Sequence, residues 1–437
     1  MTSENMLPTF PFPPGFASSR KELIGAFALA VFAAAAIGQP ASPAPSKSTP
    51  SLRQALDAAW QFSSQFRSEA NRRGELAAKE KAASSWISGE PVAGIAHRTD
   101  LLTRNEGFRE YEAEIEVPLW NRGARAAAQA DVSAQRLGFE GQFALARLKL
   151  AGELRAIVAS TATAQVERDL NQRKLQDANA LAQDVSRRVR AGENARVDAL
   201  QAQVVVQQAQ TALALADGQL NRLQTQWRGL TGLATASPLD ETLDATLTNL
   251  AGSDALPAPA PPDHPALRQA QAHVRAAQAK AALADADRRD PMTVGVGVSR
   301  ERAAFNSASE TKLRIALRIP LGGDNRNAPR QAAARAELDA AQAEADAVAR
   351  QVPADIAAAT AELRAARTAQ AAANERNRLS TEVQALITKS WRLGESDLPA
   401  RLRADNEQFE ASLSLARATV EVQRAIANLN QALGYLP

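Results

Sequence analysis

Cysteine is absent from this chain of 437 residues. Its absence excludes a disulfide framework, cysteine-ligated zinc, iron–sulfur clusters and thiol catalysis. Histidine is scarce as well: His97, His264 and His273 are the three examples, and none is paired with another residue at a metal-ligand spacing. We therefore predict no metal site, no cofactor and no histidine-based catalytic triad, and hence a protein that is not an enzyme.

Large aromatic side chains are also few, at 4% of residues, whereas alanine is abundant. Alanine favours helix because it loses no side-chain entropy there and buries no polar group. A chain of this kind is suited to long helices packed closely through small residues, and not to one broad core of large side chains. The net charge is only +3, from 51 Lys and Arg against 48 Asp and Glu, which gives no argument for nucleic acid as a partner.

The N-terminus has the pattern of a secretory signal. Arg20 and Lys21 precede an apolar run over residues 23–37, which ends in small residues and Gly38. The run is short for a membrane-spanning helix, although a single N-terminal anchor helix is the alternative. We predict a signal peptide over residues 1–38 and an extended Pro-rich linker over residues 39–50, and therefore a mature protein outside the cytoplasm.

The rest of the chain contains an internal repeat. Pro118-Leu119 falls on Pro320-Leu321 and Arg190 falls on Arg392, an offset of 202 residues that holds over more than a hundred positions. We predict a first structural repeat over residues 51–233, a Pro-rich connector over 234–265 and a second structural repeat over 266–437.

Within each repeat, one segment alternates apolar and charged residues with the period of a strand. The charged side carries Glu112, Glu114 and Glu116 in the first repeat and Arg314 and Arg318 in the second. Less regular strands precede both segments, which predicts β-hairpins over 84–119 and 291–321. A soluble sheet resting on a core and a transmembrane β-barrel with a polar lumen both show this alternation. Paired carboxylates are also the catalytic groups of glycosidases. Carboxylates at alternate positions of a regular strand are far more simply explained as the solvent-exposed face of that strand.

The remaining segments have helical periodicity. Helices are expected over residues 51–83, 120–190, 195–230, 329–391 and 397–433, with Ser51 capping the first. Pro353 predicts a kink or a break in the fourth of these helices. The last helix of each repeat has apolar residues at heptad spacing, which predicts coiled-coil packing, and Gly192 and Gly394 mark the turns of two helix hairpins.

The assembled pattern resembles the outer-membrane efflux channel family typified by TolC, over about residues 51–437. Four segments carry the resemblance: Val117-Pro-Leu-Trp-Asn-Arg-Gly-Ala-Arg125, Ile319-Pro-Leu-Gly-Gly-Asp324, Arg392-Leu-Gly-Glu-Ser-Asp397 and Leu429-Asn-Gln-Ala-Leu-Gly434. The strand-exit segments favour a resemblance to the heavy-metal exporter branch of this family. The resemblance implies a mainly α fold with a transmembrane β-barrel part, built as a homotrimer in which each protomer gives four strands to a twelve-stranded barrel.

The resemblance also implies a location and partners. The barrel would lie in outer-membrane lipid of a bacterial cell, and the helices would form a long periplasmic extension. Such a channel conducts passively and opens when it is joined by a periplasmic adaptor protein and an inner-membrane pump. The number of strands independently supports an oligomer. Four strands from one protomer cannot close a transmembrane barrel alone.

Functional positions are carried over residue by residue. The periplasmic tips that meet the adaptor would hold Arg190, Gly192, Glu193, Arg392, Gly394 and Glu395, although each glycine is equally explained as a helix cap. The family's acidic aperture is only partly matched: Asp198 is present, but the second repeat has Arg403 at an aspartate position. Candidates for the barrel lumen are Glu112, Glu114, Glu116, Arg314 and Arg318.

The leading hypothesis is thus an outer-membrane channel subunit of a tripartite efflux system, with metal cations, drugs or a secreted protein as cargo. A periplasmic coiled-coil adaptor or scaffold without a barrel would explain the helices and the signal, but not the paired strands. A cytoplasmic coiled-coil protein would require the N-terminal signal to be ignored.

Overall fold

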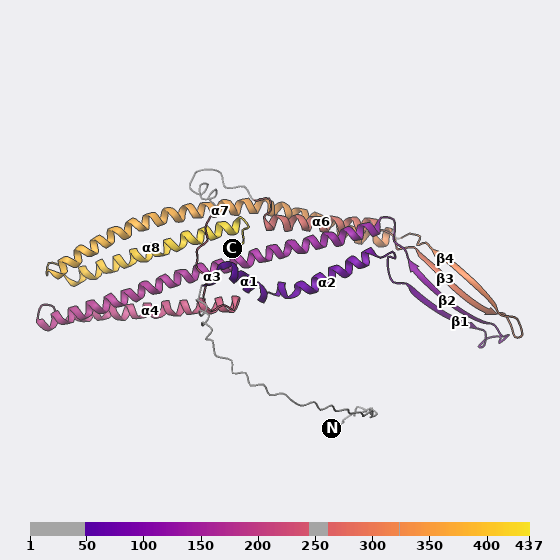
Figure 1. Ribbon diagram of the computed structural model, residues 1–437, viewed down its shortest axis with the longest axis horizontal. Helices are drawn as coiled ribbons and strands as arrows, with labels where there is room; N and C mark the ends of the chain where they lie inside the picture. Colours follow the sequence, from indigo (N-terminus) through magenta and orange to yellow (C-terminus); the bar gives the residue numbers. More distant parts are fainter. Residues whose placement is uncertain (1–48, 244–260, 323) are drawn as a thin grey trace, which may run out of the picture. The chain divides into compact units, whose positions relative to one another are not determined.

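The computed structural model describes residues 49–243, 261–322 and 324–437 (Figure 1). The expected signal peptide, most of the expected linker over residues 39–50 and the middle of the Pro-rich connector lie outside the described residues. The described part consists of helices and one four-stranded sheet, which confirms the mainly α fold class. Across this part, no helix combines the length and the apolarity required to cross a bilayer.

The same order of elements occurs twice along the chain. The first series comprises α2 (Ser64–Ser84), β1 (Val92–Thr99), β2 (Arg109–Pro118), α3 (Ala124–Ala191) and α4 (Arg196–Thr231). The second comprises α6 (Pro265–Ala286), β3 (Thr293–Arg302), β4 (Glu310–Arg318), α7 (Asp324–Arg392) and α8 (Leu398–Ala432). The helices α4 and α8 begin 202 residues apart, the offset seen between the short motifs, and the other matched elements begin 200 or 201 residues apart.

The structure corrects two expectations about the helices. The helix expected over residues 51–83 is divided into α1 (Leu52–Phe62) and α2, because Ser63 is extended and its hydroxyl accepts a hydrogen bond from the Phe66 amide at 3.2 Å. A new N-cap therefore starts a second helix. Pro353 does not break its helix, since α7 runs from Asp324 to Arg392. The alternative, a kink at Pro353, stays a prediction. Its neighbours Val352 and Ile356 are buried against α8, so tertiary packing compensates for the lost hydrogen bond.

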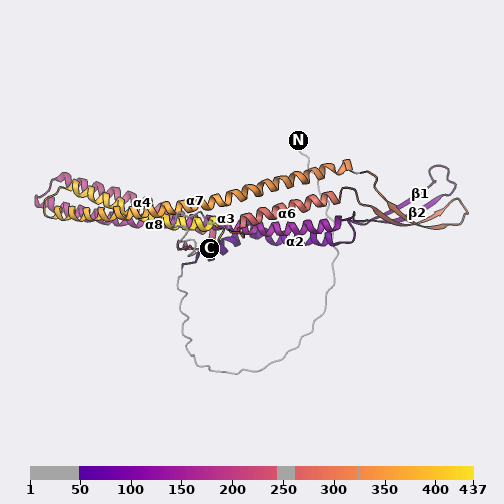
Figure 2. The same ribbon diagram turned by 90° about the horizontal axis from the view of Figure 1, so that it is seen from above.

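The four strands form one antiparallel sheet in the order β1-β2-β3-β4. The two hairpins, which are far apart in sequence, are joined by β2 and β3, with Val117 opposite Val294 and Arg109 opposite Arg302. Figures 1 and 2 both show this sheet beyond one end of α3 and α7, with the turns that lead to α4 and α8 at the other end.

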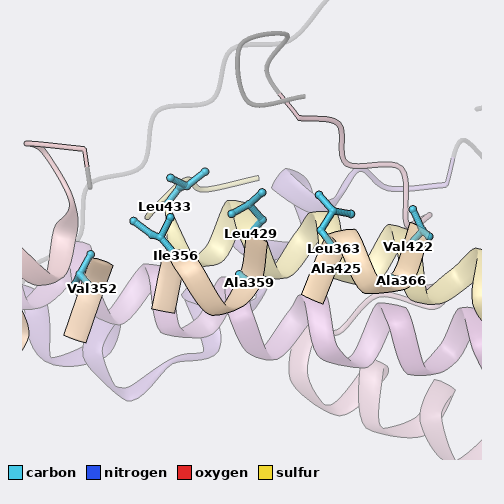
Figure 3. Close-up of a cluster of buried hydrophobic side chains, with 9 residues drawn as sticks. All are labelled: Val352, Ile356, Ala359, Leu363, Ala366, Val422, Ala425, Leu429 and Leu433. Atoms are coloured by element: carbon cyan, nitrogen blue, oxygen red, sulfur yellow. The ribbon is translucent and has the colours of Figure 1, made fainter. Parts of the chain in front are cut away.

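The helices form a layer in which α3 is central. It packs against α4, α6 and α8, and α7 packs against α6 and α8. One core lies between α7 and α8, where Ile356 and Leu363 are fully buried beside Leu429 and Leu433 (Figure 3). Alanines between these larger residues let the helix axes approach closely, as the heptad spacing indicates.

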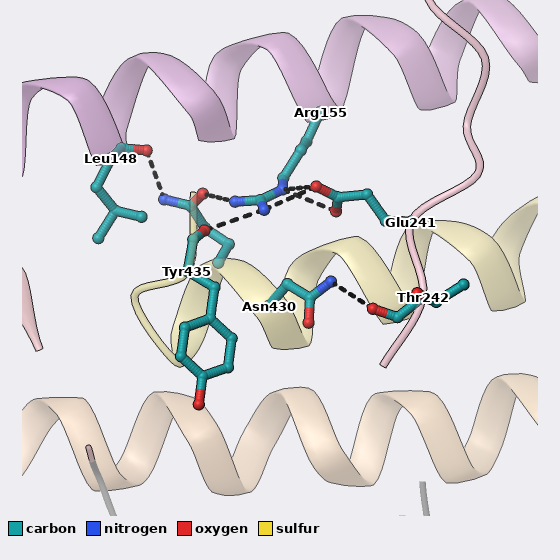
Figure 4. A network of polar contacts seen from close by, with 7 residues as sticks. Leu148, Arg155, Glu241, Thr242, Asn430 and Tyr435 are labelled. Atoms are coloured by element: carbon teal, nitrogen blue, oxygen red, sulfur yellow. Dashed lines mark hydrogen bonds and ion pairs between the residues drawn. The ribbon is translucent and has the colours of Figure 1, made fainter. Parts of the chain in front are cut away.

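A buried polar network ties three remote segments together (Figure 4). The guanidinium of Arg155 on α3 contacts both carboxylate oxygens of Glu241, with a shortest distance of 2.8 Å, and donates to the Gln431 side chain at 2.6 Å. It also donates to the Tyr435 carbonyl at 3.0 Å, and Gln431 in turn donates to the Leu148 carbonyl at 2.8 Å. The chain after α4 and the end of α8 are thereby fixed to α3.

Candidate functional site

The turns of the two helix hairpins have the same backbone geometry. Gly192 ends α3 with φ of 82°, and the Glu193 amide donates to the Arg188 carbonyl at 2.9 Å. Gly394 follows α7 with φ of 78°, and the Glu395 amide donates to the Ser390 carbonyl at 3.0 Å. Glycine is required at both positions because a side chain is strained at positive φ. Arg190 and Arg392 are exposed beside these turns.

The two turns are held together by a cluster that sequence reasoning missed. Val185, Ala202, Trp391 and Leu398 come from α3, α4, α7 and α8 and are all buried in it. The guanidinium of Arg188 lies 4.9 Å from the centre of the Trp391 ring and donates to the Trp391 carbonyl at 3.5 Å. A lone tryptophan next to the repeated Arg-x-Gly-Glu motif was the signal available in the sequence.

The two aperture candidates lie on different helices. Asp198, in the first turn of α4, is half-buried and accepts a hydrogen bond from the Asn194 side chain at 2.9 Å. Arg403 lies near the start of α8 and is exposed. Asp198 is thus engaged within its own turn, whereas the Arg403 guanidinium faces solvent in the single chain.

All five lumen candidates lie on one side of the sheet, here called the polar face. Arg314 on β4 forms an ion pair with Glu112 on β2, and Arg318 on β4 pairs with Glu116 and lies 3.9 Å from Glu114. These pairs reach across the intervening strand β3, over a distance of about 10 Å.

The small residues of β3 make this reach possible. On the polar face, β3 presents Gly295 opposite Glu116 and Gly297 opposite Glu114. A β-carbon at Gly297 would lie 3.1 Å from the Glu114 β-carbon, so a larger residue would compete with the acidic row. The acidic side chains of β2 are thus ion-paired with the basic side chains of β4 across the small residues of β3.

The opposite side of the sheet, here called the apolar face, is exposed in the single chain. Ile95, Leu313 and Ile315 are 90%, 69% and 74% exposed, and Tyr111, Ile115, Val296, Val298 and Leu317 are exposed beside them. No helix of the described chain covers this face, since the strands make their contacts with one another. An apolar surface of this extent marks a lipid or protein contact.

Comparison with known families finds a match in the second half of the chain. Residues 260–435, which include the second series of elements, match the family model described as outer membrane efflux protein. No curated protein matches the sequence at the level of a significant similarity.

Solved structures show a likeness that covers both halves of the chain. VceC from Vibrio cholerae superposes with a TM-score of 0.69 at 16% identity, covering 88% of this chain and 96% of that chain. CusC superposes with a TM-score of 0.68 at 15% identity, covering 91% and 98%. MtrE from Neisseria gonorrhoeae superposes with a TM-score of 0.67 at 17% identity, covering 88% and 89%. At these identities, the likeness shows a common fold.

The three histidines of the chain have structural partners. The His97 ring stacks on Tyr111 with ring centres 4.4 Å apart, and His273 lies 3.4 Å from Glu344. His264 is buried at the start of α6, where Nδ1 accepts from the Ala266 amide at 3.2 Å and Nε2 faces the Ala432 carbonyl at 3.2 Å. Burial lowers the pKa of His264. Within the described ranges, no group of three or more His, Asp or Glu side chains could hold a metal ion.

Proposed function

We propose that this protein is the outer-membrane channel subunit of a tripartite efflux system. It conducts small molecules, such as metal ions or drugs, passively from the periplasm to the exterior and performs no enzymatic step. The observation that carries this proposal is the two-faced sheet with open edges. Its strands have 8 to 10 residues, close to the length of a transmembrane strand.

The sheet also supports a homotrimer. An isolated four-stranded sheet in lipid leaves unpaired backbone groups along β1 and β4, and a transmembrane barrel needs about eight strands at least. Three copies joined edge to edge give twelve strands, with the apolar faces toward lipid and the polar faces toward the lumen. Glu112, Glu114, Glu116, Arg314 and Arg318 then line the lumen as ion pairs.

The helices support the same assembly. The helices α4 and α7 are the outer members of the layer α4-α3-α8-α7. Each exposes an apolar stripe: Leu200, Val204 and Leu215 on α4, and Leu379, Val383 and Leu386 on α7. In a closed ring the α4 stripe of one protomer covers the α7 stripe of the next, which continues the wall of helices. We assign the two repeats to residues 51–233 and 266–437 on this basis, with residues 234–265 as the connector.

The hairpin turns supply the partner surface. Arg190, Glu193, Arg392 and Glu395 are exposed beside glycines that only close the turns, so the charges are available to a periplasmic adaptor that links the channel to an inner-membrane pump. Asp198 and Arg403 stand six and nine positions beyond these glycines and border the periplasmic aperture in this arrangement. Reversing Arg190 and Arg392 to Glu should weaken cross-linking to the adaptor while leaving channel assembly intact.

A pair of adjacent substitutions on β4 tests the channel. Ile315 and Ala316 point to opposite faces of the sheet. Ile315→Arg puts a charge on the proposed lipid face, at a cost of roughly 2–4 kcal/mol near the bilayer centre. Ala316→Arg puts the same charge into the proposed lumen.

We expect wild type and Ala316→Arg to be recovered from outer membranes as detergent-requiring trimers that form pores in planar bilayers. Ile315→Arg should reach the outer membrane in much lower amounts. Equal behaviour of the two variants would contradict a lipid-facing sheet. A wild-type protein that is soluble in the periplasm without detergent would favour the adaptor or scaffold alternative.

A further inference from the structure

Three arginines stand together at the loop end of the apolar face. Arg109 on β2 lies directly opposite Arg302 on β3, and Arg300 lies opposite Tyr111 one row further from the loops. Directly opposed residues in an antiparallel pair have β-carbons about 5 Å apart, and like charges in that position repel each other. The backbone therefore concentrates positive charge at this point of the sheet.

No carboxylate of the described chain forms an ion pair with these guanidiniums. Arg109 and Arg300 are exposed, and their side chains have no hydrogen bond or ion pair to any described residue. The carboxylates next to the cluster in sequence, Glu110 and Glu301, lie on the polar face, where they pair with Arg98 at 3.3 Å and with Lys312 at 2.8 Å. None of the three arginines has an ion-pair partner among the described residues, whereas the charges at the same end of the polar face are paired.

The cluster is positioned by ordered loops. The Asp100 carboxylate accepts hydrogen bonds from the Glu106 and Gly107 amides at 2.6 and 3.1 Å. The Phe305 amide of the second hairpin donates to the Glu106 carbonyl at 2.9 Å, and Arg302 Nε donates to the Gly107 carbonyl at 3.3 Å. The two hairpin loops therefore hold each other, so little conformational entropy is lost when a ligand binds beside them.

The residues next to the arginine cluster are of the types that are typical of a membrane–water interface. Beyond Tyr111, the apolar face continues with Ile115, Val296 and Val298, which are all exposed. Aromatic rings and long basic side chains gather where an apolar layer meets lipid headgroups, because their stems lie in the apolar layer and their polar ends in water. A guanidinium also binds a phosphate group through two parallel hydrogen bonds.

We propose that Arg109, Arg300 and Arg302 form a binding site for the phosphate groups of an anionic lipid headgroup. The lipid belongs to the membrane leaflet that surrounds the loop end of the sheet. This site rests on the proposed function in one respect, namely that the apolar face meets lipid. Lipid binding would remove the repulsion between Arg109 and Arg302 and fix the depth of the sheet in the membrane.

The test uses the purified full-length channel in detergent, with native mass spectrometry as the readout. The probes are a bisphosphorylated lipid A and the same glycolipid without phosphates. The double variant Arg109→Gln and Arg300→Gln removes two charges from the apolar face. The control Arg98→Gln and Lys312→Gln removes two charges from the polar face at the same end.

We expect the double variant to bind the bisphosphorylated lipid at least about tenfold more weakly, since it loses two charge-assisted contacts. The control should retain wild-type binding, and the phosphate-free lipid should bind weakly to every form. Equal binding by wild type and double variant, equal losses in the variant and the control, or equal binding of the two lipids would overturn the proposal. Displacement of the lipid by an equal concentration of inorganic phosphate would also overturn it, because the site would then take free phosphate.

The failure of this inference is distinguishable from the failure of the proposed function. If wild type and variants form detergent-requiring trimers with normal conductance but bind lipid independently of the arginines, the channel stands and the lipid site does not. If no trimer forms in the outer membrane, both are wrong.

Discussion

Replacing Arg155 with methionine removes the centre of the buried network that joins α3 to the end of α8. The Arg155 side chain is 3% exposed and its partner Glu241 is 11% exposed, so neither charge is solvated well. In Arg155→Met the Glu241 carboxylate loses its bidentate partner, and the Tyr435 carbonyl and the Gln431 side chain each lose a donor. Methionine fills much of the space, so the loss is mainly electrostatic.

The expected cost is about 3–5 kcal/mol, the range for removing one member of a buried ion pair. The matched control is Arg147→Met on the same helix, whose ion pair with Asp57 at 2.6 Å is exposed and contributes at most about 1 kcal/mol. The double variant Arg155→Met and Glu241→Leu removes both charges. It should recover most of the stability, because apolar replacement of a whole buried pair is often close to neutral.

Hydrogen exchange of the detergent-solubilised protein measures the effect where it arises. In Arg155→Met, amides near the end of α8 should exchange about a hundredfold faster or more, since each 1.4 kcal/mol is about a factor of ten. Exchange in the hairpin turns around Gly192 should change little. A loss no larger than that of Arg147→Met, or a double variant as unstable as the single one, would refute a coupled buried pair.

Three further substitutions have expected outcomes. Leu363→Ala empties a fully buried position between α7 and α8 and should lower the free energy of unfolding by about 2–5 kcal/mol in thermal or denaturant unfolding. Burial lowers the pKa of His264, so the unfolded chain binds the proton more readily than the folded chain. The free energy of unfolding should therefore fall as the pH drops below about 6.5. The variant His264→Asn keeps a helix cap but should lose this pH dependence. Asp131 on α3 is nine-tenths buried with no hydrogen-bond partner for Oδ1 among the described residues, and burial raises its pKa. Asp131→Asn should therefore stabilise the protein by roughly 1 kcal/mol at neutral pH, and the gain should vanish when the pH is low enough to protonate the native carboxyl. A gain that stays constant with pH would mean that desolvation of the charge is not the cause.

The strand faces were predictable because the period of a strand is two. Glu112, Glu114 and Glu116 had to share one side of β2, and Arg314 and Arg318 had to share one side of β4. The helix hairpins were predictable for a similar local reason, since a heptad pattern interrupted by glycine has few other solutions. In each case the information lies within a few neighbouring residues.

The pairs that join the repeats were not predictable in the same way. The pairing of β2 with β3 brings Arg314 to Glu112 over the small residues of β3, and this depends on a register between segments almost two hundred residues apart. Arg188 against Trp391 and Arg155 against Glu241 depend equally on how distant helices meet. Nothing in the local pattern distinguishes these arginines from the many on exposed faces.

Local rules also failed where packing outweighed them. Pro353 has the same intrinsic helix penalty in any sequence, yet α7 continues because Val352 and Ile356 are buried on α8. The sequence by itself determined what depends on periodicity: the repeat, the two faces of each strand, the long helices and their glycine turns. The tertiary structure decided the order of the strands, the partners of the buried charges and the continuity of α7, because these depend on contacts between residues that are distant along the chain.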